Sequence, residues 1–202
     1  MAEKMMTAKT SLLSDTMLTK YSSDVQKMAI DMEYPDFHLV VQGERLACHK
    51  VFLSGRSDFF QACFHSQMKE TSADEFKIDD NTSMTSSSLK QILNYFYTGK
   101  TDSVEDYLGL FEAADYFQLV DLANWCEVKL CKNITVDNVI DCLTLCTTNT
   151  VLKLRRAAIL FVVDQWENVK QIDEWEQFVK LNPELTIEIM DEMYTQTKNL
   201  VI

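Results

Sequence analysis

Histidine and cysteine are the side chains that most often carry catalysis or bind metals, and this chain has three of the first and six of the second. The histidines are His38, His49 and His65. His38 falls inside an apolar run typical of a strand, and His49 opens a segment with the pattern of a buried helix. We therefore expect both to be structural, and the histidines indicate no catalytic constellation.

The cysteines do not form a metal-binding pattern either. Cys142 and Cys146 lie one helical turn apart and could in principle share a metal ion. A structural zinc site normally uses four soft ligands in two closely spaced pairs. Neither Cys126 and Cys131 nor the histidines supply a matching pair, so we predict free thiols in the core and no metal site.

Glycine-containing motifs for phosphate or acyl chemistry are also missing from the sequence. The four glycines are isolated, so there is no phosphate-binding loop, and no Gly-x-Ser-x-Gly elbow occurs. We expect a protein that is not an enzyme, with no catalytic residues and no cofactor.

The charge balance narrows the class of partner. The net charge is -12 and the pI is about 4.6, whereas nucleic acids and anionic membranes require clustered Lys and Arg. We therefore expect neither as a partner. The acidity serves either solubility or an acidic face for a basic partner.

The sequence has no recognisable secretory or membrane-spanning segment, which predicts the cellular compartment. No stretch approaches 18 consecutive apolar residues, and residues 1–10 lack the apolar run of a secretory signal. We expect reduced cysteines and a cytoplasmic or nuclear location.

The strands are expected early in the chain. Residues 37–42 and 45–48 have the pattern of a hairpin around Gly43, and a further short strand is expected at 75–78. Between them the pattern predicts helices at 49–54 and 57–64. A later helix is expected at 89–97, with Ser88 as its cap and Gly99 as its stop.

The rest of the chain has the pattern of helices only. Helices are expected around residues 104–114, at 119–132, at 136–147 after a capping Thr135, at 151–167 and at 175–179. The last should begin at Asn182-Pro183 and end near Lys198. Early strands followed by helices favour an α+β unit and then an all-α one.

The residues from 35 to 132 resemble the BTB/POZ family, a small sheet with surrounding helices. The similarity lies in many spaced matches rather than in one motif. They are Asp36-Phe37-His38-Leu39, Ala47-Cys48-His49-Lys50, Leu53-Ser54, Arg56-Ser57, Phe60, Phe64, Tyr97-Thr98-Gly99 and Ala113-Ala114-Asp115-Tyr116-Phe117-Gln118-Leu119.

Residues 133–202 look like the short BACK extension that follows this domain. The run from Trp175 through Phe178 to Asn182-Pro183 is similar to the closing segment of the speckle-type POZ (MATH-BTB) branch of cullin-3 adaptors. The expected organisation is an N-terminal arm, partly disordered, at 1–20, a BTB/POZ domain at 21–132 and a BACK-like helical extension at 133–202. Too few residues precede the first helix for a MATH domain.

The resemblance implies a non-catalytic dimeric adaptor that recruits a cullin-3 scaffold to form a ubiquitin ligase for protein substrates. The family recruits cullin-3 through a hydrophobic-x-Glu motif in the loop after the paired helices, where Met68-Lys69-Glu70 stands here. The implied cullin-binding residues are Phe64, Met68, Glu70, Tyr116 and Phe117. The alternative for Phe64, Tyr116 and Phe117 is a place in the core, and Phe64 could have both roles. The residues favoured for the homodimer interface are Met17, Val25, Met28 and Met32.

Two other functions remain open at this point. The chain could be a BTB dimerisation scaffold for transcriptional co-regulators, although it has no Cys2His2 finger. It could also be a MATH-less partner that heterodimerises with full-length relatives. In the leading hypothesis, the substrate protein is held by a missing or separate domain.

Overall fold

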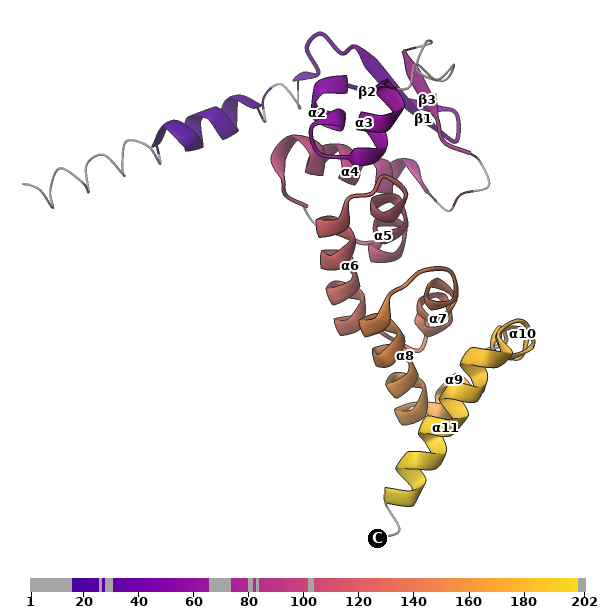
Figure 1. The fold of residues 1–202 in the computed structure, drawn as a ribbon. Helices are drawn as coiled ribbons and strands as arrows, with labels where there is room; N and C mark the ends of the chain where they lie inside the picture. The colour runs from indigo at the N-terminus through magenta and orange to yellow at the C-terminus, as the bar shows by residue number, and fades with distance from the viewer. Residues whose placement is uncertain are drawn as a thin grey trace, which may run out of the picture. The chain divides into compact units, whose positions relative to one another are not determined.

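The computed structural model describes residues 16–25, 27, 31–65, 74–79, 82, 84–101 and 104–199. The chain divides into two compact units, Met1–Leu119 and Val120–Ile202. Within the described residues, the first unit holds a three-stranded sheet and helices, and the second holds helices alone (Figure 1). This confirms the predicted α+β fold with a helical C-terminal extension.

The sheet is built around a hairpin. β1 (Phe37–Val41) pairs antiparallel with β2 (Glu44–Cys48) and parallel with β3 (Glu75–Lys77), giving the order β2-β1-β3. Gln42 and Gly43 form the turn with φ of 49° and 80°, the left-handed pair that a two-residue hairpin of this twist requires. Alternate residues of β1 are buried, so one face of the strand lies in the core.

Among the described residues, 16–25 are helical, and four further helices of the first unit follow the start of the sheet. They are α2 (Lys50–Ser54), α3 (Asp58–His65), α4 (Ser86–Thr98) and α5 (Tyr107–Tyr116). α2 lies beside α3, and α4 packs against α2, β2 and α5 (Figure 1). The predicted helices and hairpin of this region are therefore present.

The start of α4 differs from the prediction. The helix begins three residues earlier than expected, and its cap is Thr85 rather than Ser88. The Ser88 amide donates to Thr85 Oγ1 at 3.1 Å, and the Thr85 amide donates to Ser88 Oγ at 3.0 Å, which is a capping box. A run of Ser and Thr offers several possible caps, and pattern alone does not choose among them. Gly99 ends the helix with φ of 69°, as predicted.

His49 has the structural role that was predicted. Its ring is buried, with Nε2 2.9 Å from the Glu33 carbonyl and Nδ1 2.6 Å from the Tyr97 hydroxyl. Because a carbonyl can only accept, Nε2 donates to Glu33, and in the neutral ring Nδ1 then accepts from the Tyr97 hydroxyl. The ring therefore ties the chain before β1 to the end of α4.

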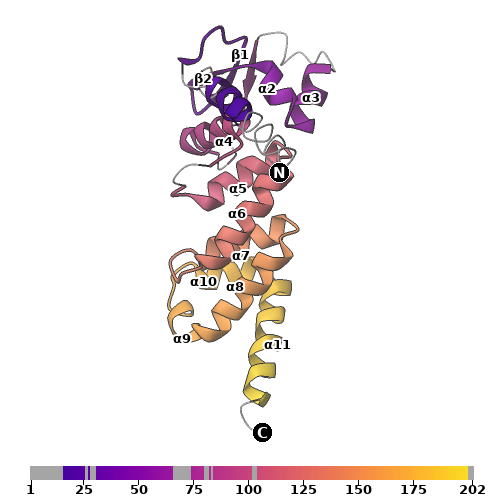
Figure 2. The same ribbon diagram turned by 90° about the vertical axis from the view of Figure 1, so that its left-hand side faces the viewer.

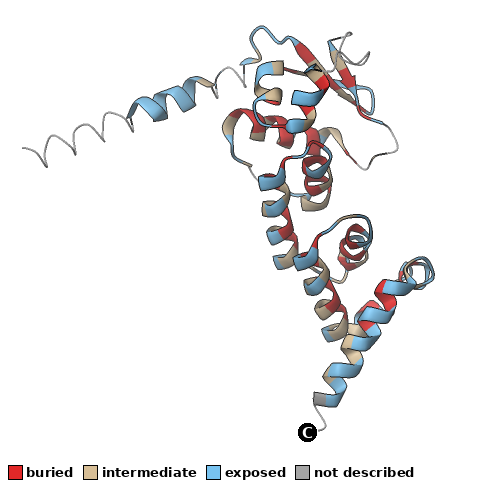
Figure 3. Cartoon of the chain, viewed as in Figure 1, coloured by how far each residue is buried: buried red, intermediate tan, exposed pale blue. Residues whose placement is uncertain are grey.

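The second unit is arranged around one helix. Its elements are α6 (Val120–Lys132), α7 (Val139–Thr148), α8 (Leu152–Asp164), α9 (Trp166–Val169), α10 (Trp175–Leu181) and α11 (Pro183–Asn199). α8 packs against α6, α7 and α11 (Figure 2). Buried residues follow one side of α6 and of α8, as an amphipathic pattern requires (Figure 3).

Two helix boundaries in this unit were predicted wrongly. α7 begins at Val139 and not at residue 136, because the Asn138 side chain accepts from the Thr135 amide at 2.8 Å and holds a turn before the helix. The single helix expected at 151–167 is α8 and α9, separated at Gln165. The final helix starts at Pro183, as expected.

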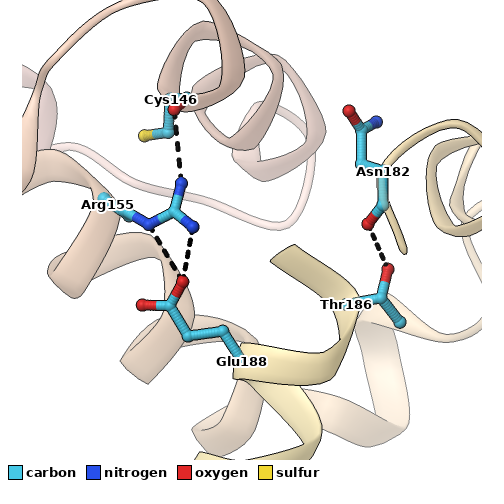
Figure 4. Close-up of polar contacts among 5 residues, drawn as sticks. All are labelled: Cys146, Arg155, Asn182, Thr186 and Glu188. Atoms are coloured by element: carbon cyan, nitrogen blue, oxygen red, sulfur yellow. Dashed lines mark hydrogen bonds and ion pairs between the residues drawn. The ribbon is translucent and has the colours of Figure 1, made fainter. Parts of the chain in front are cut away.

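Two polar clusters fix the helices of the second unit. The buried Glu127 carboxylate of α6 accepts from the amides of Lys153 and Leu154 at 3.0 and 3.2 Å. It thereby caps α8, whose preceding residue makes no side-chain cap. Arg155 Nε donates to Glu188 Oε2 at 3.0 Å and Nη1 donates to the Cys146 carbonyl at 3.4 Å, which joins α8 to α11 and α7 (Figure 4).

Candidate protein-interaction groove

The first unit carries a groove bounded by α3, β3 and the end of α5. Its volume is about 620 Å³, within the range of binding clefts. Residues 66–73, which lie between α3 and β3 in the sequence, are outside the described residues. The lining residues are Asp58, Phe59, Ala62, Cys63, Glu75, Phe76, Lys77, Asp79, Tyr116 and Gln118.

Aromatic rings form the floor of the groove. The half-buried Phe59 ring contacts those of Phe76 and Tyr116, with centroid distances of 5.5 and 5.4 Å. Beneath it, Phe60 is fully buried and stacks on Phe117 at 4.9 Å. The groove therefore has a rigid apolar floor supported by a close-packed aromatic layer.

A buried serine links two walls of the groove. Ser57 caps α3, since its Oγ accepts from the Phe60 amide at 3.2 Å. The same hydroxyl donates to the Phe117 carbonyl at 2.6 Å. The beginning of α3 and the end of α5 are thus held together by one side chain that is only 2 % exposed.

The end of α5 has an unusual backbone. Gln118 adopts φ of 56°, in the left-handed region that glycine normally occupies after a helix. The conformation lets the Leu119 amide donate to the Ala114 carbonyl at 2.8 Å, which closes the helix end. The strain is held at a residue that lines the groove, and such strained residues cluster at functional sites.

Charged groups surround the apolar floor. Glu75 pairs with Arg45 at 3.2 Å and with Lys77 at 3.4 Å. Asp58, in the first turn of α3, is exposed. Among the described residues, the lining combines three carboxylates with one lysine.

The rest of the described structure offers little chemistry. Burial raises the pKa of the Cys48, Cys126, Cys142 and Cys146 thiols to about 12, which keeps them protonated and poorly nucleophilic. In the described part of the chain, no three His, Cys, Asp or Glu side chains are placed to hold a metal ion. No helix there is long and apolar enough to span a membrane.

The family model of the BTB/POZ domain matches residues 25–134. The chain belongs to the BTB/POZ family. Because BTB/POZ domains are protein-interaction modules, a protein-interaction role follows for this chain.

Several proteins of Mus musculus are among the curated relatives of the BTB/POZ chain. TD and POZ domain-containing protein 1 is 29 % identical over 163 residues, which cover 79 % of this chain and 44 % of the relative. TD and POZ domain-containing protein 3 is 30 % identical over 158 residues, or 77 % and 42 % of the two chains. The chain therefore spans less than half the length of these relatives.

The structure places three of the five residues implied for cullin binding. Phe64 is half-buried, with its ring 5.1 Å from that of Phe37. Tyr116 is 37 % exposed and lines the groove, whereas Phe117 is fully buried beneath it. Phe117 thus supports the BTB/POZ groove from the core and offers no surface to a partner. Met68 and Glu70 lie outside the described residues.

The residues favoured for the dimer interface are described in part. Met17 is 73 % exposed, Val25 and Met32 are partly exposed, and Met28 lies outside the described residues. Nothing in the described single chain tests whether they meet a second copy, so their role stays a prediction, as does the boundary at residue 132.

The sequence interpretation missed Phe59, Ala62 and Phe76 as groove residues. Phe59, Ala62 and Cys63 are spaced by three and four residues, so they share a helix face. That spacing was available as a signal. It does not show which face of α3 is covered by the domain's own core.

Proposed function

We propose that the chain is a non-catalytic dimeric adaptor that recruits cullin-3 to a ubiquitin ligase, with the groove as its docking site. The observation that supports this most directly is the position of Met68-Lys69-Glu70. In sequence it lies between His65, where α3 ends, and β3, and these two elements are walls of the groove. A methionine anchor and a carboxylate from this segment would complete a site with an aromatic floor.

The proposed adaptor function also includes roles for the second unit and for dimerisation. The all-helical second unit is a BACK-like extension in this proposal, and the chain resembles the speckle-type branch. The helical residues 16–25 support a dimer, since Met17, Leu18 and Tyr21 are all at least 66 % exposed and need a covering surface. The six cysteines are free, in accord with a cytoplasmic or nuclear location.

The experiment is a titration of the purified chain with the N-terminal region of cullin-3 by calorimetry, after light scattering has given its mass. A dimer that binds one cullin per chain supports the proposal. Replacing Met68 and Glu70 together with alanine should then weaken binding by about 2 kcal/mol or more, with the dimer intact. A wild-type dimer that does not bind cullin-3 refutes the cullin-3 assignment.

A matched pair of variants on one helix tests the groove itself. Ala62→Trp fills the groove, whereas Gln61→Trp adds the same ring to a neighbouring exposed position that does not line it. Both positions are exposed, so both variants should fold and give the same melting temperature. We expect binding to be lost with Ala62→Trp alone. Equal binding by both variants would place the docking site elsewhere.

A further inference from the structure

Gln118 is exposed although both of its neighbours in the chain are buried. Phe117 is fully buried and Leu119 is 4 % exposed, whereas Gln118 stands at the surface and lines the groove. The chain turns at Gln118, whose φ is 56°, and both neighbours enter the core. A long polar side chain thus lines the groove from a position between two core residues.

The backbone is fixed on both sides of Gln118. On one side, the Phe117 carbonyl accepts from the buried Ser57 hydroxyl at 2.6 Å. On the other, the Leu119 amide donates to the Ala114 carbonyl at 2.8 Å. Because the backbone is already in place, a hydrogen bond from the Gln118 side chain to a partner costs only the ordering of that side chain.

The Gln118 side chain also differs chemically from its surroundings. It is the one side-chain amide among the described residues that line the groove, and an amide can donate and accept hydrogen bonds at once. Glu75 and Lys77 are paired with each other at 3.4 Å, whereas the Gln118 side chain makes no hydrogen bond to a described residue. Within the described structure, its polar atoms are therefore available to a partner.

The stability of the fold does not require glutamine at this position. A left-handed residue after a helix is most often glycine, for which this backbone carries no steric cost. Gln42 offers a comparison, since it has φ of 49° in the turn between β1 and β2 but does not line the groove. The two glutamines share the same kind of backbone and differ in their access to the groove.

We propose that Gln118 is a specificity-determining residue of the groove, and that its side chain hydrogen-bonds an amide group of the segment that docks there. The side chain then serves binding at a small cost in stability. The inference rests on the groove being the docking site of the proposed function, and it adds a polar contact that the apolar floor cannot supply.

The test compares Gln118→Gly with Gln42→Gly in the full chain. Both variants relieve the same kind of backbone strain, so neither should lower the urea midpoint. Only Gln118→Gly should weaken binding of the N-terminal region of cullin-3 in calorimetry, by about tenfold for one lost hydrogen bond. A lower midpoint for Gln118→Gly would make the residue structural, and unchanged binding would make it idle; either result overturns the inference.

A third variant tests the hydrogen bond itself. Gln118→Met keeps the length of the side chain and removes both the donor and the acceptor. It should weaken binding about as much as Gln118→Gly does. Wild-type affinity in Gln118→Met would show that the side chain acts through its bulk alone, which overturns the proposed hydrogen bond.

A displayed library of random peptides separates the inference from the cullin-3 assignment. Peptides are selected on the full chain, and those that still bind the Ala62→Trp variant are discarded, so the remainder report the groove without any cullin. In a chain that does not bind cullin-3, peptides that weaken about tenfold with Gln118→Gly and not with Gln42→Gly remove the cullin-3 assignment and support the role of Gln118. Peptides that bind wild type and Gln118→Gly equally, or the absence of any groove-dependent peptide in that chain, overturn the inference.

Discussion

Replacing Ser57 with alanine should destabilise the first unit more than any other loss of a single oxygen atom near the groove. The hydroxyl is buried and makes two hydrogen bonds, one from the Phe60 amide and one to the Phe117 carbonyl. Losing a serine N-cap costs about 1 kcal/mol. Leaving a buried carbonyl without its donor costs about 1–3 kcal/mol more. Since a carbonyl can be partly satisfied by water, we expect a total of about 2 kcal/mol.

The assay is urea unfolding of the full chain followed by circular dichroism. With a slope of about 2 kcal/mol per molar urea, a loss of 2 kcal/mol lowers the midpoint by about 1 M. Ser54→Ala is the matched control, because the Ser54 hydroxyl makes only a 3.4 Å contact with the Val51 carbonyl of its own helix. It should change stability by less than about 0.5 kcal/mol. Equal midpoints for the two variants would refute the view that Ser57 joins the walls of the groove.

Three further predictions concern other parts of the molecule. Glu127→Ala should lower the free energy of unfolding of the second unit by about 2 kcal/mol, because two amides of α8 lose a buried acceptor. Urea unfolding followed by tryptophan fluorescence measures this loss, since all three tryptophans lie in that unit. An unchanged urea midpoint would contradict the prediction. Gln118→Gly should stabilise the first unit by about 0.5 kcal/mol. The left-handed backbone costs a non-glycine residue about 1–2 kcal/mol, and the entropy that glycine loses on folding offsets about 0.5–1 kcal/mol of the gain. A lower urea midpoint would show that the contacts of the Gln118 side chain outweigh the relief of backbone strain. Lys50 holds the pKa of the Asp74 carboxyl below its ordinary value through a 2.8 Å hydrogen bond. The pair therefore stabilises the fold above the ordinary pKa of aspartate and is lost as the pH falls through the lowered one. An NMR titration of Lys50→Met should show the Asp74 pKa rising, and an unmoved pKa would exclude the pair in solution.

Local sequence signals were enough to predict most of the secondary structure. Gly43 and Gly99 each stand where a positive φ is required, so the hairpin and the end of α4 could be placed from the sequence. Pro183 in a first turn likewise located the start of α11. The boundaries that failed were those where polar residues compete for one cap, as at Thr85 and Ser88, or where a packed helix breaks without a glycine or proline, as at Gln165.

The candidate site was predictable only in part. Tyr116 was identified through a family resemblance, and it lines the groove. Phe117, its neighbour in the sequence, is fully buried. Adjacent residues at the end of a helix point in different directions, and no pattern within that helix shows which direction meets α3 and which meets solvent.

The sequence by itself determined which segments are strands and helices, that the chain is acidic, and that it lacks a catalytic motif, because these depend on residue type and local spacing. Only the tertiary structure decided that α3, β3 and the end of α5 enclose one groove, with Ser57 joining two of its walls. The Ser57 to Phe117 hydrogen bond spans 60 residues. Contacts across such separations arise when the core closes, and they leave no periodic trace in the sequence that makes them.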